Sequence, residues 1–399
     1  MGKPGGCREV SLHSPLGDGF ARVFRLFHPV TIVSIMPGTM EFAPSSMRHA
    51  RTVLAVAAVT ALLLVAVTFS PLRSGFADAP DRGAGDVVLY QAEAGRIAAG
   101  ENYYDTIASE LRSRGYPMQS VFNWRTPLPV WLVGVLPHDW AQALLVATAG
   151  AAWLLGLALL ARDFGRLGAL AGLVTLSGAL LPCLLDDVFI MPEVWAGVLI
   201  GLSAAAYGTE RNRLGCAAAL AALLVRELAA PWCLICLICD VRSRGRRAAA
   251  AWGIGFAVYA MLYALHLGQV LPRIMPDDIT QGQSWIRFGA AGFLISTVQM
   301  NIWLLLTPQW LTAIYLTAAL LGAAGWSNPA GRRIAWGVVA YAIAFSIAGQ
   351  AINQYWGSLI APLFALAAAA APSGLARLVR RASRWPAAVA DQPATTVAY

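Results

Sequence analysis

The residues best suited to chemistry in this 399-residue chain are a few acids and arginines that stand inside or beside long apolar runs. Arg226 and Glu227 occupy the middle of the apolar run 214–239, and Glu193 follows Pro192 at the start of another run. Ionisable side chains are costly at membrane depth and are therefore typical of functional sites. Mutual neutralisation of Arg226 and Glu227 is the alternative explanation for that pair.

Arginines in this pattern indicate an anion site. A planar guanidinium binds phosphate through paired hydrogen bonds, and Arg226 would carry its charge to the tip of a half-membrane hairpin. We therefore predict that Arg226 holds a phosphate delivered by a lipid. Arg273 and Arg287, on a later outer segment, are further candidates.

Four acids lie near expected helix ends on the side that we place outside the membrane. Asp86 is either a helix N-cap or a catalytic or binding carboxylate, and one residue can serve as both. Glu193 gains about 0.3–1 kcal/mol from a helix dipole and is equally a candidate for binding. Asp186 and Asp187 form an exposed loop or, alternatively, bind a divalent cation such as Mg²⁺ or Mn²⁺. The sequence indicates no metal-ligand cluster and no other cofactor.

Two short amphipathic helices are expected from Asp86 onward, lying across the outer mouth of the protein. The first runs to Gly100, with Glu93 and Arg96 at the i, i+3 spacing of a surface ion pair. The second begins after the cap residue Asn102. A polar and aromatic turn then leads the chain back toward the membrane, so the loop as a whole predicts an outer vestibule.

The composition requires lipid around the chain. Hydrophobic residues make up 58% of it, charged residues 13%, and the mean hydropathy is +0.60, which is more apolar surface than one water-soluble core can bury. The net charge of +8 does not indicate nucleic acid, because the arginines lie between apolar runs rather than on a basic domain. Most runs are close to the ~20 residues of a spanning helix and predict roughly eight to ten passes: 53–70, 141–161, 167–185, 189–207, 214–239, 248–268, 304–325, 334–352 and 356–376.

The positions of the arginines set the orientation, since Lys and Arg are retained in the cytoplasm. Arg48 and Arg51 place the N-terminus inside and the loop 71–140 outside. Continued alternation makes 269–303 a second outer loop, with an amphipathic stretch over 285–303 along the membrane interface. We therefore expect a multi-pass protein of the cytoplasmic (inner) membrane with a cytoplasmic N-terminus.

The run 214–239 breaks this alternation, because the arginines that follow it would also have to lie inside. Its polar centre predicts a re-entrant hairpin of two half-helices that enter from the cytoplasm and return. The complete prediction is an all-α, polytopic transmembrane protein with one domain over 47–380. An N-terminal extension, 1–46, precedes this domain, and a cytoplasmic tail, 381–399, follows it.

Three cysteines in the same run, Cys233, Cys236 and Cys239, have the spacing C-x-x-C-x-x-C. An iron–sulfur or zinc site is one explanation. The spacing is also that of one helical face, the intervening residues are Leu and Ile, and no partner cluster is near in sequence. Buried packing cysteines are therefore favoured.

These features resemble the polytopic C-fold glycosyltransferases that use a polyprenyl-phosphate sugar, including bacterial mannosyl- and arabinosyltransferase-like members. The resemblance spans residues 50–380 and rests on Asp86, an acid shortly after the first membrane helix that heads a long outer loop with two interfacial helices. The stretch GENYY resembles part of that loop, and FNWRTP, PEVWAG and RELAAP resemble uncharacterised members. The chain departs from the family in lacking a paired acid beside Asp86 and a large soluble C-terminal domain.

The resemblance implies a membrane glycosyltransferase, transferring a hexose or a pentose with inversion from a polyprenyl-phosphate donor. The acceptor would be a glycan or lipid of the cell envelope on the outer face of the membrane. Asp86 matches the family's acidic position and is predicted to be the catalytic base. Phosphate binding falls to Arg226, Arg273 and Arg287. Sugar and acceptor contacts are expected from the remaining side chains of the site, for which interfacial packing is the alternative: Tyr103, Tyr104, Asn123, Trp124, Arg125 and Glu193.

Two other classes compete with this prediction. A secondary transporter or flippase of a lipid-linked or anionic substrate would also contain a broken helix with an Arg-Glu pair. It predicts an internal repeat, whereas the loop 71–140 has no counterpart in the second half of the chain. A non-catalytic lipid-binding or scaffold protein could keep the same fold but would tolerate the loss of Asp86.

Overall fold

The computed structural model describes residues 47–70, 85–280, 282, 284–286, 288 and 290–383. Within these residues every regular element is a helix, and a single isolated bridge pairs Ile286 with Ala348. The all-α prediction is confirmed for this part of the chain. The helices are α3 (Met47–Thr68), α5 (Gly85–Ala98), α6 (Tyr103–Ser113), η2 (Val121–Asn123), α7 (Pro127–Val135), α8 (His138–Leu180), η3 (Leu181–Leu184), α9 (Pro192–Gly208), α10 (Asn212–Val225), η4 (Glu227–Ala229), α11 (Ala230–Arg244), α12 (Arg246–Val270), η5 (Leu271–Arg273), α13 (Ala290–Val298), α14 (Ile302–Leu305), α15 (Gln309–Ala324), α16 (Pro329–Ile347), η6 (Ala351–Trp356) and α17 (Gly357–Ser383).

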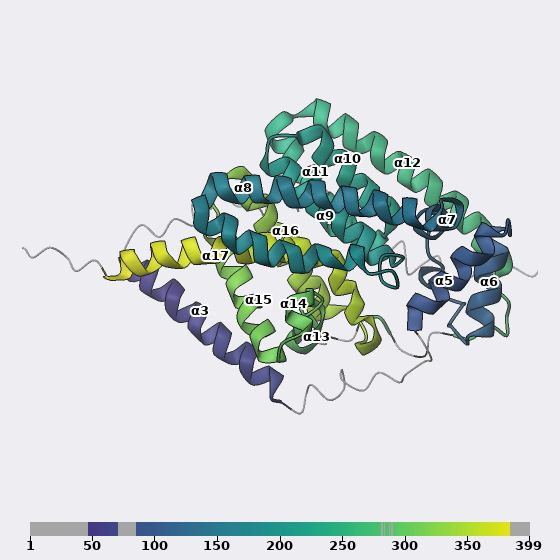
Figure 1. The fold of residues 1–399 in the computed structure, drawn as a ribbon, viewed down its shortest axis with the longest axis horizontal. Coiled ribbons are helices and arrows are strands. Elements are labelled where there is room, and N and C mark those ends of the chain that lie inside the picture. Colours follow the sequence, from purple (N-terminus) through teal and green to yellow (C-terminus); the bar gives the residue numbers. More distant parts are fainter. Residues whose placement is uncertain are drawn as a thin grey trace, which may run out of the picture. The chain divides into compact units, whose positions relative to one another are not determined.

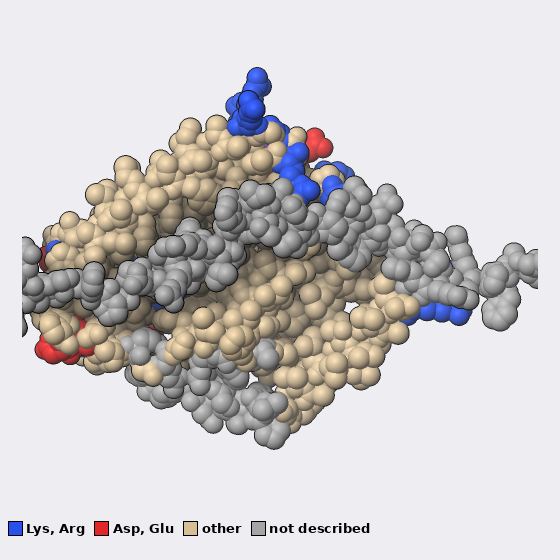
Figure 2. Space-filling view, turned by 180° about the vertical axis from the view of Figure 1, so that it is seen from behind, with Lys and Arg blue, Asp and Glu red and all other residues tan. Residues whose placement is uncertain are grey.

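Four helical stretches among the described residues are long and apolar enough to cross a membrane: Ala50–Thr68, His138–Leu184, Arg246–Arg273 and Ile352–Arg380. On one face of the molecule, the charged side chains of described residues lie toward the margins and leave a broad area without Lys, Arg, Asp or Glu (Figure 2). Such a surface suits contact with lipid.

The sequence predicted more passes than these four. The other apolar runs are helical, but α10 and α15 are shorter than a spanning helix, and α9 has 17 residues. The extension 1–46 lies outside the described residues, and α17 continues to Ser383, past the predicted start of the tail at 381.

Helix α8 contains two of the predicted runs. Its backbone turns at Gly165, where φ is 65°, a conformation that glycine adopts without steric cost. The two halves of α8 are antiparallel (Figure 1). They pack closely against each other, since Gly172 lies against Leu160 and Gly156 lies against Leu176. A glycine turn thus separates the two apolar runs, 141–161 and 167–185, that the sequence predicted, although the turn itself was not predicted.

The run 214–239 folds as a helical hairpin. Helix α10 ends at Val225, Arg226 has an extended backbone, and α11 starts at Ala230 with a proline in its first turn. The two helices are antiparallel, because Cys233 donates to the carbonyl of Ala219 at 3.1 Å across the hairpin. The predicted pair of half-helices is therefore present, with Arg226 at the tip, and its depth in a membrane stays a prediction. Cys233 and Cys236 are buried in this packing.

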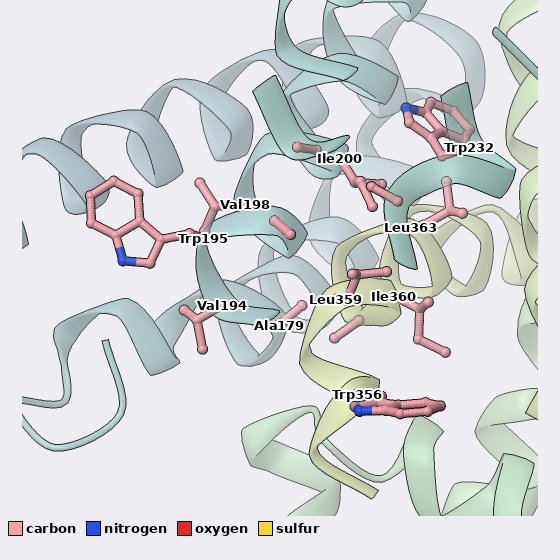
Figure 3. Close-up of a cluster of buried hydrophobic side chains, with 14 of the residues drawn as sticks. Ala179, Val194, Trp195, Val198, Ile200, Trp232, Trp356, Leu359, Ile360 and Leu363 are labelled. Atoms are coloured by element: carbon pink, nitrogen blue, oxygen red, sulfur yellow. The ribbon is translucent and has the colours of Figure 1, made fainter. Parts of the chain in front are cut away.

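The alanine-rich helix α17 forms the core with α8, α9 and α15. Small residues bring the backbones close: Gly197 of α9 lies against Ser358, and Gly322 of α15 lies against the carbonyl of Ala367. Such small-residue contacts are typical of helices packed in membranes. Figure 3 shows larger side chains filling the space around them, including Ile200 of α9, Trp232 of α11 and Leu363 of α17.

For the two segments predicted to lie outside the membrane, the sequence indicated the start of α6 correctly but did not indicate the packing of α13. Helix α6 begins as predicted, since the Asn102 side chain accepts hydrogen bonds from the backbone N–H groups of Tyr104 and Asp105. The stretch expected to lie along the interface over 285–303 instead contains α13, whose residues 293–298 are all buried against neighbouring helices. Its amphipathic pattern did not reveal that α13 packs against α16, α15 and α17.

We predict that Gly322→Ala destabilises the fold. A methyl group there would meet the backbone carbonyl of Ala367, which cannot rotate away, and overpacking of this kind costs about 1–3 kcal/mol. The melting temperature of the detergent-purified variant should fall. Gly253→Ala is the matched control, because no atom lies within 4 Å of the added methyl group on α12. Equal melting temperatures for the two variants would contradict the close packing of α15 on α17.

Candidate functional site

The centre of the candidate site is a buried guanidinium held between two carboxylates. Arg226 Nε donates to Glu193 Oε1 at 2.7 Å, and its Nη1 donates to Glu227 Oε1 at 2.7 Å. The side chains of Arg226 and Glu193 are 1% and 0% exposed. A charge so far from water requires direct partners. These bonds fasten the tip of the α10–α11 hairpin to the first turn of α9.

A second contact brings the turn before α7 to the same hairpin tip. Thr126 Oγ1 donates to the carbonyls of Leu224 and Val225, at 3.1 and 3.2 Å. Both carbonyls belong to the last turn of α10, where no intrahelical donor remains. Arg125, one residue earlier, is thereby fixed near the buried pair.

Arg125 is a guanidinium with neutral partners. Its Nε donates to the Tyr90 hydroxyl oxygen at 3.1 Å, and its Nη1 donates to the Phe122 carbonyl at 2.7 Å. Within the described residues no carboxylate is at ion-pair distance from it, although the charges of Glu193 and Glu227 act on it. Its side chain is partly exposed. Arg125 thus keeps donors and positive charge available to an added anion.

Asp86 joins the cluster from α5. It lies in the first turn of that helix, four residues before Tyr90, and it is half-buried. Its Oδ1 accepts a hydrogen bond from the Tyr116 hydroxyl at 2.8 Å. The charges of Asp86, Arg125, Glu193 and Arg226 all act on Tyr355 of η6. Five segments that are distant in sequence therefore converge: the start of α5, the turn before α7, the start of α9, the hairpin tip and η6.

Glu93 is not the surface residue that its spacing suggested. It is 2% exposed, and its Oε2 has no hydrogen-bond partner among the described residues. Arg96 pairs with Glu101 and Glu110 instead. The i, i+3 rule considers α5 alone, whereas the helix turns its Leu89–Tyr90–Glu93 face inward. Burial raises the pKa of Glu93 well above its usual value, against a smaller opposing effect of Arg125.

Three of the predicted sugar-binding residues use their polar groups to build the turn around Arg125. The Tyr103 hydroxyl donates to the Arg125 carbonyl at 2.9 Å. The Trp124 indole N–H donates to the Met118 carbonyl at 2.9 Å, and the Asn123 amide donates to Pro117 at 2.6 Å. Tyr103 and Trp124 are buried. Their contacts are those of residues that position Arg125.

Arg273 and Tyr104 form a neighbouring patch rather than part of this cluster. Arg273 lies 5.5 Å from the centre of the Tyr104 ring, and its Nε donates to Asp105 at 2.9 Å. The Tyr104 hydroxyl lies 3.3 Å from His266 Nδ1. Of the three predicted phosphate-binding arginines only Arg226 lies in the cluster, and Arg287 is outside the described residues.

Asp186 and Asp187 are exposed and accept hydrogen bonds from Gln142 and Gln91, each at 3.1 Å. In the part of the chain that the structure describes, no group of three or more His, Cys, Asp or Glu residues is arranged to hold a metal ion. The two acids connect the loop before α9 to α8 and α5.

Sequence reasoning missed several members of this arrangement. Tyr90 is recognisable in retrospect, because it stands one helical turn after Asp86, but nothing local indicates the roles of Tyr116 and Tyr355. It also missed Asp240, a buried acid on α11 that accepts hydrogen bonds from Tyr207 at 2.7 Å and Trp252 at 2.9 Å.

Comparison with known proteins finds no family model, no curated protein and no solved structure that matches the chain.

Loss of the buried positive charge of Arg226 should strongly destabilise the protein. Arg226→Gln leaves Glu193 and Glu227 facing each other without their partner, and breaking a buried pair in this way costs about 3–5 kcal/mol. Thermal unfolding in detergent measures the loss. Arg114→Gln is the control, because Arg114 pairs with Glu110 at the surface, where an ion pair contributes about 0–1 kcal/mol. Similar losses in both variants would show that Arg226 is not the buried anchor.

Proposed function

We propose that the protein is an inverting membrane glycosyltransferase. It moves a sugar from a polyprenyl-phosphate donor to a glycan or lipid acceptor of the cell envelope, on the outer face of the cytoplasmic membrane. The observation that carries the proposal is the convergence of Asp86, Arg125, Glu193 and Arg226 from four distant segments. One carboxylate and one available guanidinium are the two groups that this transfer requires.

The proposed chemistry is a single displacement. The acceptor hydroxyl oxygen forms a bond to the anomeric carbon as the bond from that carbon to the phosphate oxygen breaks. Asp86 takes the hydroxyl proton, and the polyprenyl phosphate leaves with the electron pair of the broken bond. One carboxylate is sufficient, because the sugar is inverted without a covalent enzyme intermediate.

We assign the phosphate to Arg125 rather than to Arg226, the first choice from sequence. Arg226 already binds Glu193 and Glu227, so an additional anion would find its charge neutralised. Arg125 has neutral hydrogen-bond partners and is partly exposed. A guanidinium in a site partly shielded from water stabilises the charge that develops on the leaving phosphate. Arg226 then acts as the residue that positions the site.

The proposed membrane topology supports this arrangement. The site lies where α9 and α17 begin, and the loop helices α5 and α6 contribute to it. Exposed arginines occur around the α11–α12 turn, at the opposite end of the α10–α11 hairpin. Retention of arginine in the cytoplasm therefore puts the site on the outer side, within reach of a lipid-linked donor that enters from the bilayer.

The first test is Asp86→Asn in the native host. Asparagine keeps the size of the side chain but cannot accept the proton, so the variant should match a deletion strain. We expect it to lose one envelope glycan linkage while undecorated acceptor and polyprenyl-phosphate sugar accumulate, at normal protein abundance. Analysis of envelope glycans and of extracted lipids measures both effects.

Asp139→Asn is the matched control for this variant. Asp139 also lies in the first turn of a helix, α8, and is exposed outside the cluster, so its loss should leave the glycans unchanged. If Asp86→Asn behaves as wild type beside a deletion with a clear phenotype, Asp86 is only a helix-start residue. The transporter or scaffold alternative then replaces the transferase.

Arg125→Gln tests the phosphate site in the purified protein. Loss of the charged hydrogen bonds should weaken the binding of polyprenyl monophosphate at least tenfold, which corresponds to about 1.4 kcal/mol. Arg125→Lys should recover part of this loss, since an ammonium keeps the charge without the paired geometry. Native mass spectrometry in detergent measures the affinities, and Arg114→Gln is the control for charge alone. Unchanged affinity in Arg125→Gln would remove Arg125 from the phosphate site.

A further inference from the structure

Tyr116 occupies a rigid position beside the candidate base. It directly follows Gly115, where φ is 70°, two residues after the end of α6 at Ser113. Its backbone N–H donates to the Leu111 carbonyl at 2.9 Å, the closing bond of this helix terminus. The helix terminus therefore fixes the backbone of Tyr116, and the Tyr116 hydroxyl reaches the first turn of α5 from this constrained position.

The Tyr116 hydroxyl donates to Asp86 Oδ1 at 2.8 Å. Among the described residues no other donor is bonded to the Asp86 carboxylate, so Oδ2 accepts no hydrogen bond from them. A carboxylate with one oxygen held in this way has a restricted rotamer, with its second oxygen directed away from the tyrosine. A reacting base needs this orientation toward the proton that it removes.

We propose that Tyr116 is a positioning residue for the transfer reaction: it holds Asp86 Oδ1 so that Oδ2 faces the acceptor hydroxyl. The inference rests on the proposed function, in which Asp86 is the base. Tyr116 touches neither substrate in this scheme and acts through Asp86 alone.

The groups around Asp86 support this division of roles. Tyr90 and Glu93 of α5 and Tyr355 of η6 interact electrostatically with Asp86, but among the described residues only Tyr116 donates a hydrogen bond to it. Burial, together with the negative charge of Asp86, raises the pKa of Tyr116, and Arg114 opposes this effect. The hydroxyl therefore keeps its proton and remains a donor throughout the working pH range.

Tyr116→Phe tests the proposal, because it removes the hydroxyl and keeps the ring. In transfer assays with purified protein, kcat should fall about tenfold, while KM for the donor changes less than twofold, since Tyr116 does not bind it. Unchanged kcat, or an equal effect on KM and kcat, would overturn the positioning role.

Tyr207→Phe is the matched control. The Tyr207 hydroxyl also donates to an aspartate, Asp240 Oδ2, at 2.7 Å, at the other end of the α10–α11 hairpin. Its loss should lower the melting temperature and leave kcat within twofold of wild type. An equal fall of kcat in both variants would mean that loss of any tyrosine–aspartate bond slows transfer through the fold, and the proposal would fail.

A double-mutant cycle separates action through Asp86 from independent action. In the Asp86→Asn background, adding Tyr116→Phe should change the residual rate less than twofold, whereas a further tenfold loss would overturn the inference. Infrared difference spectra against Asp86→Asn give a readout without turnover. The carboxylate stretch of Asp86 should shift in Tyr116→Phe and stay in place in Tyr207→Phe, and an unshifted band in Tyr116→Phe would contradict the bond.

The two levels of proposal fail in different ways. If Asp86→Asn leaves the envelope glycans and the transfer rate unchanged, the proposed function fails. If Asp86→Asn is inactive but Tyr116→Phe retains the wild-type kcat, the transferase proposal stands and only the role of Tyr116 falls.

Discussion

The ion pairs of Arg226 determine how the end of the helical bundle at the tip of the α10–α11 hairpin is assembled. A guanidinium that is 1% exposed must be matched by charge and hydrogen bonds, or the cost of removing it from water would exceed the stability of a typical domain. Glu193 meets this requirement from α9, and Glu227 meets it from the adjacent turn. The hairpin tip therefore has a fixed position relative to α9, and the segments around it pack onto a rigid base.

Arg226 and Arg125 have different roles, because only the charge of Arg226 is neutralised by carboxylates. Arg226 is the more deeply buried of the two, and its charge is already balanced, so it stabilises and positions the site. Arg125 depends on that base through its neighbour Thr126, which donates to the last carbonyls of α10. The buried side chains Tyr103 and Trp124 then hold the backbone around Arg125. The polar groups of Tyr103 and Trp124 are thus used to position Arg125.

Close helix packing explains why the site can be this precise. Glycines at the contacts of α9 and α15 with α17 bring backbones together, which leaves little freedom for helices to slide. The starts of α9 and α17 consequently stay aligned, and Glu193 and Tyr355 approach the same cluster. The loop helices add Asp86 through a capped hairpin, in which Asn102 caps the start of α6 and Gly115 follows its C-cap, Arg114.

Local signals in the sequence determined the helical class, the division of α8 into two apolar runs, the broken run at Arg226 and the Asn102 cap. They could do so because apolar period, glycine, proline and capping residues act within a few turns of one chain segment. The predicted Glu93–Arg96 pair was wrong and the burial of α13 was not foreseen, because a local pattern takes no account of packing by other helices. Only the tertiary structure decided that Arg226 is neutralised, that Arg125 is available and that Tyr116 reaches Asp86. Each of these depends on residues from different helices, and a long-range contact leaves no trace in the local spacing of either partner.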